Sequence, residues 1–167
     1  AMLNLLLGYG RMWKLVEGLA GEYGCEVAGI VDPLVGSEDV SSDRWRDVDV
    51  AIDFTSPAAV ARNVPILARR QIGVVLGTTG WHEYEKDLRW AVAQAGSGVV
   101  AAPNFSAGVV IFESIVAPAA ALMASQAEFG AFLHESHHAA KKDAPSGTAL
   151  LLKRAMEQAG FTRPIDV

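Results

Sequence analysis

Short aliphatic runs alternate with longer segments of helical character along the first two thirds of the chain. The runs are residues 3–7, 26–31, 48–54, 72–76 and 98–102. Strands that are almost continuously apolar are typical of a parallel sheet covered on both faces, because neither face meets water. The alternation therefore predicts an α/β fold built on a doubly wound parallel sheet.

The connecting segments carry helix signals. Between the first two runs, one helical face holds three apolar residues, Leu15, Val16 and Leu19. After the third run, Ser56 followed by Pro57 is typical of an N-cap and a first helical residue. Pro65 interrupts the apolar stripe of that helix, which predicts a kink or a restart there.

The pattern changes after Phe105. An apolar, alanine-rich segment covers residues 107–124, and a strand-like segment follows at residues 129–133. We therefore expect a hinge near residues 104–107 and two domains, residues 1–105 and residues 106–167. The second domain is expected to be α+β and, with so few residues, incomplete.

A glycine-rich turn follows the first run and opens the first helix, with Gly8, Gly10, Arg11 and Met12. This is where a Rossmann-type fold binds the pyrophosphate of a dinucleotide. Asp32 follows the second run, 22 residues after Gly10, where a carboxylate can accept hydrogen bonds from an adenosine ribose. No Arg lies close to Asp32, which favours NADH over NADPH and leaves NADPH possible. A tight turn without a ligand would leave the same pattern.

Two further loops follow the fourth and fifth runs. They contain Gly77, Thr78, Thr79, Ala102, Asn104 and Phe105. Ligands of open α/β sheets bind along the carboxyl edge, where both loops are expected to lie. Their neutral hydrogen-bonding groups suit a nicotinamide, so residues 1–105 are expected to bind the dinucleotide. One residue departs from the glycine fingerprint, because Trp13 stands where a third glycine normally lets helix and strand pack closely.

Imidazole and ammonium groups gather in residues 137–148, just before a predicted helix. His137, His138 and Lys141 precede Pro145, and the helix is expected to contain Ser146, Gly147 and Thr148 in its first turn. Free N–H groups at a helix start bind carboxylates. This segment therefore suits an anionic small molecule that must be held and protonated. A solvated loop with a capped helix would have the same composition.

The residues together resemble the dihydrodipicolinate reductase family. Residues 135–149 fit its pattern E-x-H-H-x-x-K-x-D-A-P-S-G-T-A throughout, and the cofactor motifs appear in the family's order, at residues 8–12, 53–55, 77–80 and 104–106. The resemblance covers the whole chain. Family members continue for roughly half as long again beyond Val167, which agrees with an incomplete second domain.

The resemblance implies an oxidoreductase that transfers a hydride from NAD(P)H to 4-hydroxy-tetrahydrodipicolinate, giving tetrahydrodipicolinate in lysine and diaminopimelate biosynthesis. By matching position, His137 and Lys141 would donate the proton. The substrate is a dicarboxylate, and the residues implied to bind it are His138, Lys141, Ser146, Gly147 and Thr148. A homotetramer is also implied if the substrate domain is complete.

Composition limits the partners and the compartment. The net charge is −5 and the isoelectric point is about 5.3, which disfavours nucleic acid. The single cysteine, Cys25, favours a reducing compartment, and the short N-terminal apolar run of residues 3–7 supports neither a signal peptide nor a membrane span. We therefore expect a cytoplasmic protein without a membrane partner.

Two other functions use the same residues. Residues 134–138 read H-E-x-x-H, the motif of zinc hydrolases, which works only when both histidines lie on one helix. The strand-like sequence before His134 and the nearby Pro145 leave little room for that helix, so no metal is expected. The second alternative is a non-catalytic or truncated dinucleotide-binding module, which would bind the cofactor without turnover.

Overall fold

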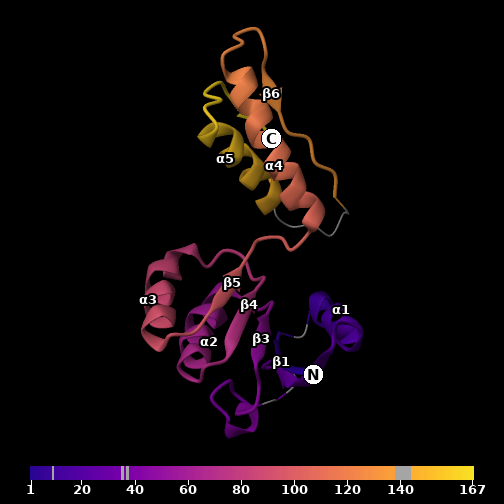
Figure 1. Cartoon of the computed structure of the whole chain (residues 1–167), viewed down its shortest axis with the longest axis vertical. Helices are drawn as coiled ribbons and strands as arrows, with labels where there is room; N and C mark the ends of the chain where they lie inside the picture. Colours follow the sequence, from indigo (N-terminus) through magenta and orange to yellow (C-terminus); the bar gives the residue numbers. More distant parts are fainter. Residues whose placement is uncertain (9, 35, 37, 138–143) are drawn as a thin grey trace. The chain divides into compact units, whose positions relative to one another are not determined.

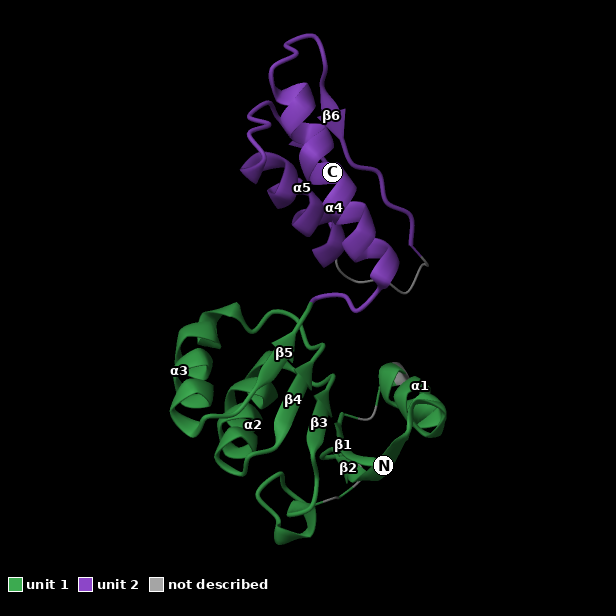
Figure 2. Cartoon of the chain, viewed as in Figure 1, with its two compact units in different colours: residues 1–102 green, residues 103–167 purple. Residues whose placement is uncertain are grey.

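The computed structural model describes residues 1–8, 10–34, 36, 38–137 and 144–167. The chain forms two compact units, residues 1–102 and residues 103–167, shown in different colours in Figure 2.

Unit 1 contains a five-stranded sheet in which every neighbouring pair of strands is parallel (Figure 1). The strand order is β2-β1-β3-β4-β5. The strands are β1 (Met2–Leu7), β2 (Cys25–Val31), β3 (Val50–Asp53), β4 (Gly73–Leu76) and β5 (Val99–Ala101). The parallel, Rossmann-type α/β sheet predicted from the aliphatic runs is confirmed.

The helices of unit 1 connect these strands. They are α1 (Arg11–Ala20), α2 (Pro57–Arg69) and α3 (Glu85–Ala95), with short 3₁₀ helices at Gly21–Tyr23, Asp43–Trp45 and His82–Tyr84. The side chain of Ser56 caps α2 by accepting a hydrogen bond from Ala59 N, as its sequence predicts. The helix continues through Pro65, so the expected restart is wrong. Burial of Val64 and Leu67 on both sides of the proline favours one continuous helix.

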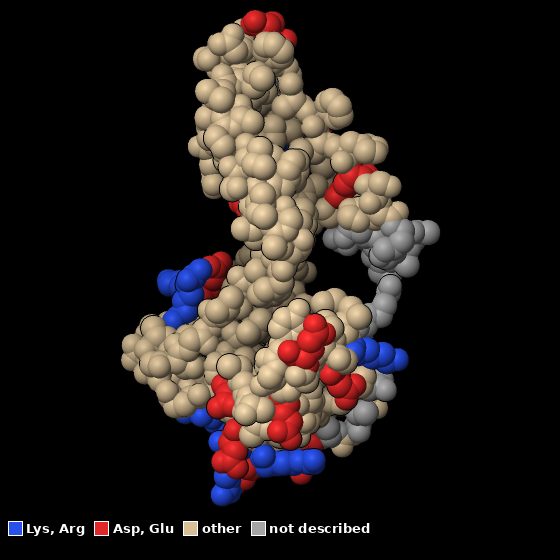
Figure 3. Space-filling view, turned by 45° about the vertical axis from the view of Figure 1, so that its right-hand side comes forward, with Lys and Arg blue, Asp and Glu red and all other residues tan. Residues whose placement is uncertain are grey.

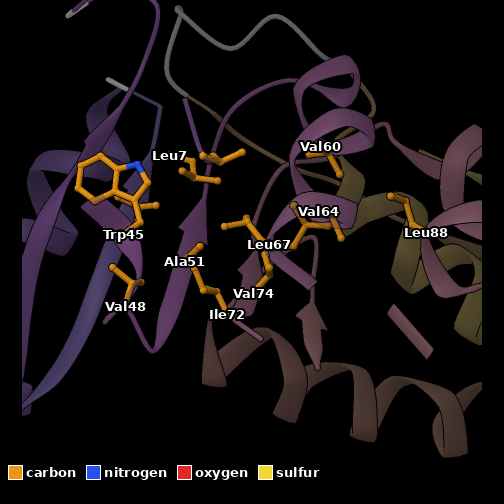
Figure 4. Packing of buried hydrophobic residues seen from close by; sticks show 13 residues of the cluster. Leu7, Trp45, Val48, Ala51, Val60, Val64, Leu67, Ile72, Val74 and Leu88 are labelled. Carbon is orange, nitrogen blue, oxygen red and sulfur yellow. The ribbon is translucent and has the colours of Figure 1, made fainter. Parts of the chain in front are cut away.

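The main hydrophobic core lies between the sheet and α2 and α3 (Figure 4). Aliphatic side chains from three central strands meet the buried stripe of α2, and Leu88 joins them from α3. The most completely buried members are Leu5, Val40, Ala51, Val60 and Leu67. Each buried aliphatic side chain of this size stabilises the fold by about 1.5–3 kcal/mol.

The first helix packs less well than its sequence predicts. No described residue of α1 belongs to the core cluster, and Leu15 and Leu19 are 58% and 48% exposed. The expectation that Leu15, Val16 and Leu19 form a packing face is therefore wrong for two of the three residues. Trp13 stands where the fingerprint glycine normally permits close contact between helix and strand, which agrees with this loose packing.

Unit 2 consists of two helices and two very short strands. Helices α4 (Ala107–Ala124) and α5 (Gly147–Gln158) pack together, and β6 (Ala131–Phe132) pairs in parallel with β7 (Ile165–Asp166). A small core of Ala120, Met156, Phe161 and Ile165 joins them. The apolar, alanine-rich segment at residues 107–124 forms α4. The strand expected at residues 129–133 is shorter than predicted, because only Ala131–Phe132 pair with the two residues of β7.

Most of α4 faces solvent within unit 2. Its exposed large side chains are Val110, Ile111, Phe112, Ile115, Leu122 and Met123. The face of unit 2 seen in Figure 3 carries few charged side chains. By length and composition alone, α4 is long and apolar enough to cross a membrane. This is weak evidence for a membrane span, because the core helices of soluble proteins pass the same test. Large apolar side chains exposed in this number are typical of a surface that contacts another molecule, and nothing in the described residues covers them.

Candidate active site

The predicted cofactor residues follow a single row of strand ends. In the sheet register, Val31 pairs with Leu7, Leu7 with Asp53, Asp53 with Leu76, and Leu76 with Ala101. The residues that come next in the chain are Asp32, Gly8, Phe54, Gly77 and Ala102. Four of these five are predicted to bind the cofactor, so the sheet brings together loops that are far apart in the sequence.

Gly8 lies at the point where the strand order reverses, between β1 and β3. Ligands of open α/β sheets bind at such a switch point. Gly8 has a φ of +98°, and an added Cβ atom would lie 2.6 Å from Phe54 O. Only glycine fits both the backbone conformation and this close approach.

The start of α1 is open to an anion. Its N-cap is Gly10, no side chain caps it, and its first turn contains no acidic residue. No atom lies within 4 Å of an added Cβ atom at Gly10. First-turn N–H groups without an intrahelical acceptor fit a phosphate. Met12 is exposed, and the side chain of Arg11 lies outside what the structure describes.

Asp32 stands directly after β2 and is half-buried. Its Oδ1 accepts a hydrogen bond from Leu34 N at 2.7 Å, which fixes the carboxylate at the sheet edge. A carboxylate can accept several hydrogen bonds, so this turn leaves the predicted ribose contact chemically compatible. The contact itself stays a prediction.

The threonine loop, residues 77–80, is held against β3. Gly77 N donates to Asp53 O at 2.9 Å, and Trp81 Nε1 donates to Thr78 O at 2.8 Å. The two threonines differ, because Thr78 is buried and Thr79 is exposed. Only Thr79 therefore presents its side chain to solvent.

Replacing Gly77 by alanine is expected to destabilise this loop. An added Cβ atom would lie 2.0 Å from Phe54 Cε1, so the aromatic ring must move. We expect a loss of about 1–3 kcal/mol in the free energy of unfolding, the usual cost of overpacking. Urea denaturation measures it, with Gly98→Ala as the control, since nothing lies within 4 Å of a Cβ atom there. An equal loss in a Phe54→Ala background would contradict the steric explanation.

The predicted cofactor residues after β5 lie where unit 1 ends and unit 2 begins, because Ala102 is the last residue of unit 1. Ala102 N donates to Leu76 O, and Phe105 is half exposed. Both ends of the Asn104 amide are engaged, because Oδ1 accepts from Ser106 N at 2.7 Å and Nδ2 donates to Thr148 Oγ1 at 3.3 Å. Asn104 therefore links the starts of α4 and α5, and its predicted cofactor contact is untested.

Glu135 connects the candidate proton donor to the start of α5. Its Oε2 lies 2.9 Å from His137 Nε2, and its Oε1 accepts a hydrogen bond from Ser146 N at 2.8 Å. Hydrogen bonds from Ser146, and then from His137, lower the pKa of Glu135 from 4.5 to about 2. The carboxylate is therefore charged at neutral pH. The sequence argument missed this role, although Glu135 is the first residue of the signature, two residues before His137.

The first turn of α5 has both satisfied and unsatisfied donors. Ser146 is buried, and its hydroxyl accepts from Ala149 N as an N-cap. Its N–H is taken by Glu135, so the N–H groups of Gly147 and Thr148 are the ones without an acceptor in the described part of the chain. Of the other predicted site residues, His138 and Lys141 lie outside the described residues.

The zinc alternative requires His134 and His138 to lie on one helix. After β6, residues 133–137 form no helix, and His138 lies outside the described residues. Among the described residues, no group of three potential metal ligands is present.

A cavity of about 550 Å³ lies elsewhere, along β5 and α3. Its lining is mainly aliphatic, and Arg89 is its one charged side chain. None of the predicted site residues lines it. The chemistry-bearing groups are therefore at the strand ends and at the start of α5, where the protein surface is open.

Comparison with known families covers both units. Residues 5–105 match the family described as dihydrodipicolinate reductase, N-terminus, and residues 108–164 match dihydrodipicolinate reductase, C-terminus. The chain belongs to the dihydrodipicolinate reductase family. The resemblance inferred from the signature segment is confirmed.

Individual relatives agree with this family. The chain is 33% identical over 154 residues to the 4-hydroxy-tetrahydrodipicolinate reductase of Christiangramia forsetii, covering 92% of this chain and 63% of the relative. It is 36% identical over 146 residues to that of Hahella chejuensis, covering 87% and 54%. The chain thus spans less than two thirds of the length of the curated relatives it matches.

A solved structure supports the fold. The dipicolinate-bound dihydrodipicolinate reductase from Paenisporosarcina sp. TG-14 superposes with a TM-score of 0.70 at 21% identity. The match covers 98% of this chain and 68% of that one. The arrangement of strands and helices is therefore that of the family in both units.

Within this family fold, Trp13→Gly is expected to tighten NADH binding. Glycine would allow α1 to approach the sheet, bringing the first-turn N–H groups closer to the strand ends. Isothermal titration with NADH measures the change. Leu15→Gly is the control, because it places a glycine in the same helix at an exposed position and frees no space at the turn. Weaker binding by Trp13→Gly would mean that the indole is part of the site.

Proposed function

We propose that the chain is the cofactor-binding and proton-donating part of a 4-hydroxy-tetrahydrodipicolinate reductase. The row of strand ends carries this proposal, because it gathers Gly8, Asp32 and Gly77 at one edge. The reaction consumes one hydride and one proton, and the substrate hydroxyl leaves as water. A nicotinamide cofactor, when bound, supplies the hydride.

The residues of unit 1 fit that cofactor. The uncapped start of α1 at Gly10 would hold the pyrophosphate, and Asp32 would accept from the adenosine ribose. The backbone of the threonine loop, with Thr79, would bind the nicotinamide end, together with Ala102, Asn104 and Phe105. The absence of an arginine next to Asp32 supports NADH as the preferred cofactor, with NADPH possible.

The residues of unit 2 fit a dicarboxylate. The free N–H groups of Gly147 and Thr148 would bind one carboxylate, with His138 and Lys141 supplying positive charge. His137 would act as the acid, with Lys141 as its companion. Because Nε2 of His137 faces Glu135, Nδ1 is the nitrogen that can release a proton to the substrate. Glu135 then keeps the ring oriented while water restores the proton.

The same proposal includes the setting of the enzyme. We propose a cytoplasmic protein that binds a small dicarboxylate and has neither nucleic acid nor membrane as a partner. The net charge of −5 supports the exclusion of nucleic acid. A homotetramer is proposed for the complete enzyme, and the exposed apolar side chains of α4 agree with an association surface in unit 2.

Oxidation of NADH and of NADPH by the purified chain tests this function. The substrate is generated fresh by the synthase reaction that precedes it, and a parallel sample contains a chelator. Chelator-insensitive turnover supports the reductase, and chelator-sensitive hydrolysis would revive the zinc alternative. Cofactor binding without turnover would instead identify a dinucleotide-binding module, the second function that the sequence allows.

A further inference from the structure

Asp53 belongs to the cofactor motif at residues 53–55, but the proposed function gives its buried carboxylate no role of its own. It is the last residue of β3, and its relative exposure is 0%. Carboxylates are almost never fully buried unless a cation pairs with them. In the described ranges, none of the ion pairs involves Asp53. Its charge is therefore held by hydrogen bonds alone.

All of these hydrogen bonds converge on one oxygen. Oδ1 of Asp53 accepts from Thr55 N at 3.0 Å, from Thr55 Oγ1 at 2.7 Å and from Thr78 Oγ1 at 2.8 Å. Oδ2 is buried and has no partner within the described residues. The carboxylate thus joins the end of β3 to the threonine loop after β4, and half of its accepting capacity is unused.

This arrangement costs stability rather than supplying it. Burial raises the pKa of Asp53 above its ordinary value of 3.8, although hydrogen bonds from Thr55 and Thr78 act in the opposite direction. A buried acid without a cation is destabilising compared with a neutral side chain of the same shape. Residues that destabilise a fold while organising a loop are typical of functional sites.

The hydrogen of the Thr78 hydroxyl is committed to this network. The hydroxyl donates to Asp53 Oδ1 and accepts from Thr55 N at 2.7 Å. A hydroxyl has a single hydrogen to donate, so Thr78 has none left for a ligand. The exposed Thr79 and the loop backbone remain as the groups that can contact a cofactor.

We propose that Asp53 is a positioning residue, which fixes the threonine loop through Thr78 in the conformation that binds the nicotinamide cofactor without touching the cofactor itself. This inference rests on the proposed function. It also gives the two threonines different roles. Thr78 positions the loop through its hydrogen bond to Asp53, whereas Thr79 contacts the cofactor.

Titration of the full chain with NADH and NADPH tests the proposal. Asp53→Ala and Thr78→Val should each raise the cofactor dissociation constant roughly tenfold or more, the scale of a lost hydrogen bond to a charged group. Thr78→Ser keeps the hydroxyl and should restore binding. In the Asp53→Ala background, Thr78→Val should cost nothing further, whereas Thr79→Val should cost the same factor in both backgrounds.

Val48→Ala is the control for a general loss of stability, because it creates a cavity in the core before β3 begins, at the end of the strand opposite to Asp53. It should lower the melting temperature and leave the dissociation constant unchanged. Additive effects of Asp53→Ala and Thr78→Val, or unchanged affinity in either variant, would overturn the positioning role of Asp53. The proposed function would then still stand. A parent chain that binds neither nucleotide would overturn the proposed function and this inference with it.

Discussion

Replacing His137 by alanine is expected to lower kcat by about 10²–10⁴-fold, the contribution of a well-positioned general acid. The side chain is partly exposed and held by Glu135, so it can reach a substrate while its ring orientation is fixed. Binding of NADH should be unaffected, because the groups proposed to bind its pyrophosphate and ribose belong to unit 1. Steady-state kinetics together with NADH titration separates these two effects.

His134→Ala is the matched control for this experiment. His134 is exposed and makes no hydrogen bond or ion pair in the described part of the chain. Its replacement should leave turnover at the level of the unaltered chain. A zinc hydrolase would require His134 and would show the reverse order of effects. Near-normal turnover by His137→Ala would remove His137 from the proton-donating role.

The arrangement of the cofactor loops was predictable from the sequence because it depends on simple periodicity. Aliphatic runs of strand length define a parallel sheet, and parallel strands end at one edge. Gly8, Asp32 and Gly77 therefore had to lie near one another once the runs were recognised. The resemblance to the family added the expected roles of His137 and Lys141, which periodicity alone does not supply.

The supporting side chains were not predictable in the same way. Asp53 and Glu135 act through contacts with Thr78 and Ser146, each more than ten residues away in the chain. Such pairings depend on sheet register and on the path of a loop. Neither can be worked out from the spacing of residue types along a single sequence. The packing of α1 was mispredicted for a related reason, because apolar spacing indicates a helical face without showing what it meets.

Glu135→Gln is expected to reduce kcat at least about tenfold, a part of the factor supplied by the acid it orients. The amide oxygen can still accept from Ser146 N, so the start of α5 should be retained, while the negative charge facing His137 is lost. The dissociation constant for NADH should not change. Glu157→Gln, an exposed carboxylate on α5, removes the same charge from unit 2 and should have no effect on turnover.

The same variant should lower stability most at neutral pH and progressively less in acid. Hydrogen bonds from Ser146 and His137 lower the folded-state pKa of Glu135 to about 2, from 4.5. A depressed pKa stabilises the fold fully above the unfolded value, and this contribution is lost as pH falls from 4.5 towards 2. The difference in unfolding free energy between the parent chain and Glu135→Gln should therefore shrink across that window. The raised pKa of Asp53 is common to both proteins and cancels in the difference. A difference that is constant with pH would show that Glu135 is not charged and hydrogen-bonded as the structure has it, and its orienting role would fail with it.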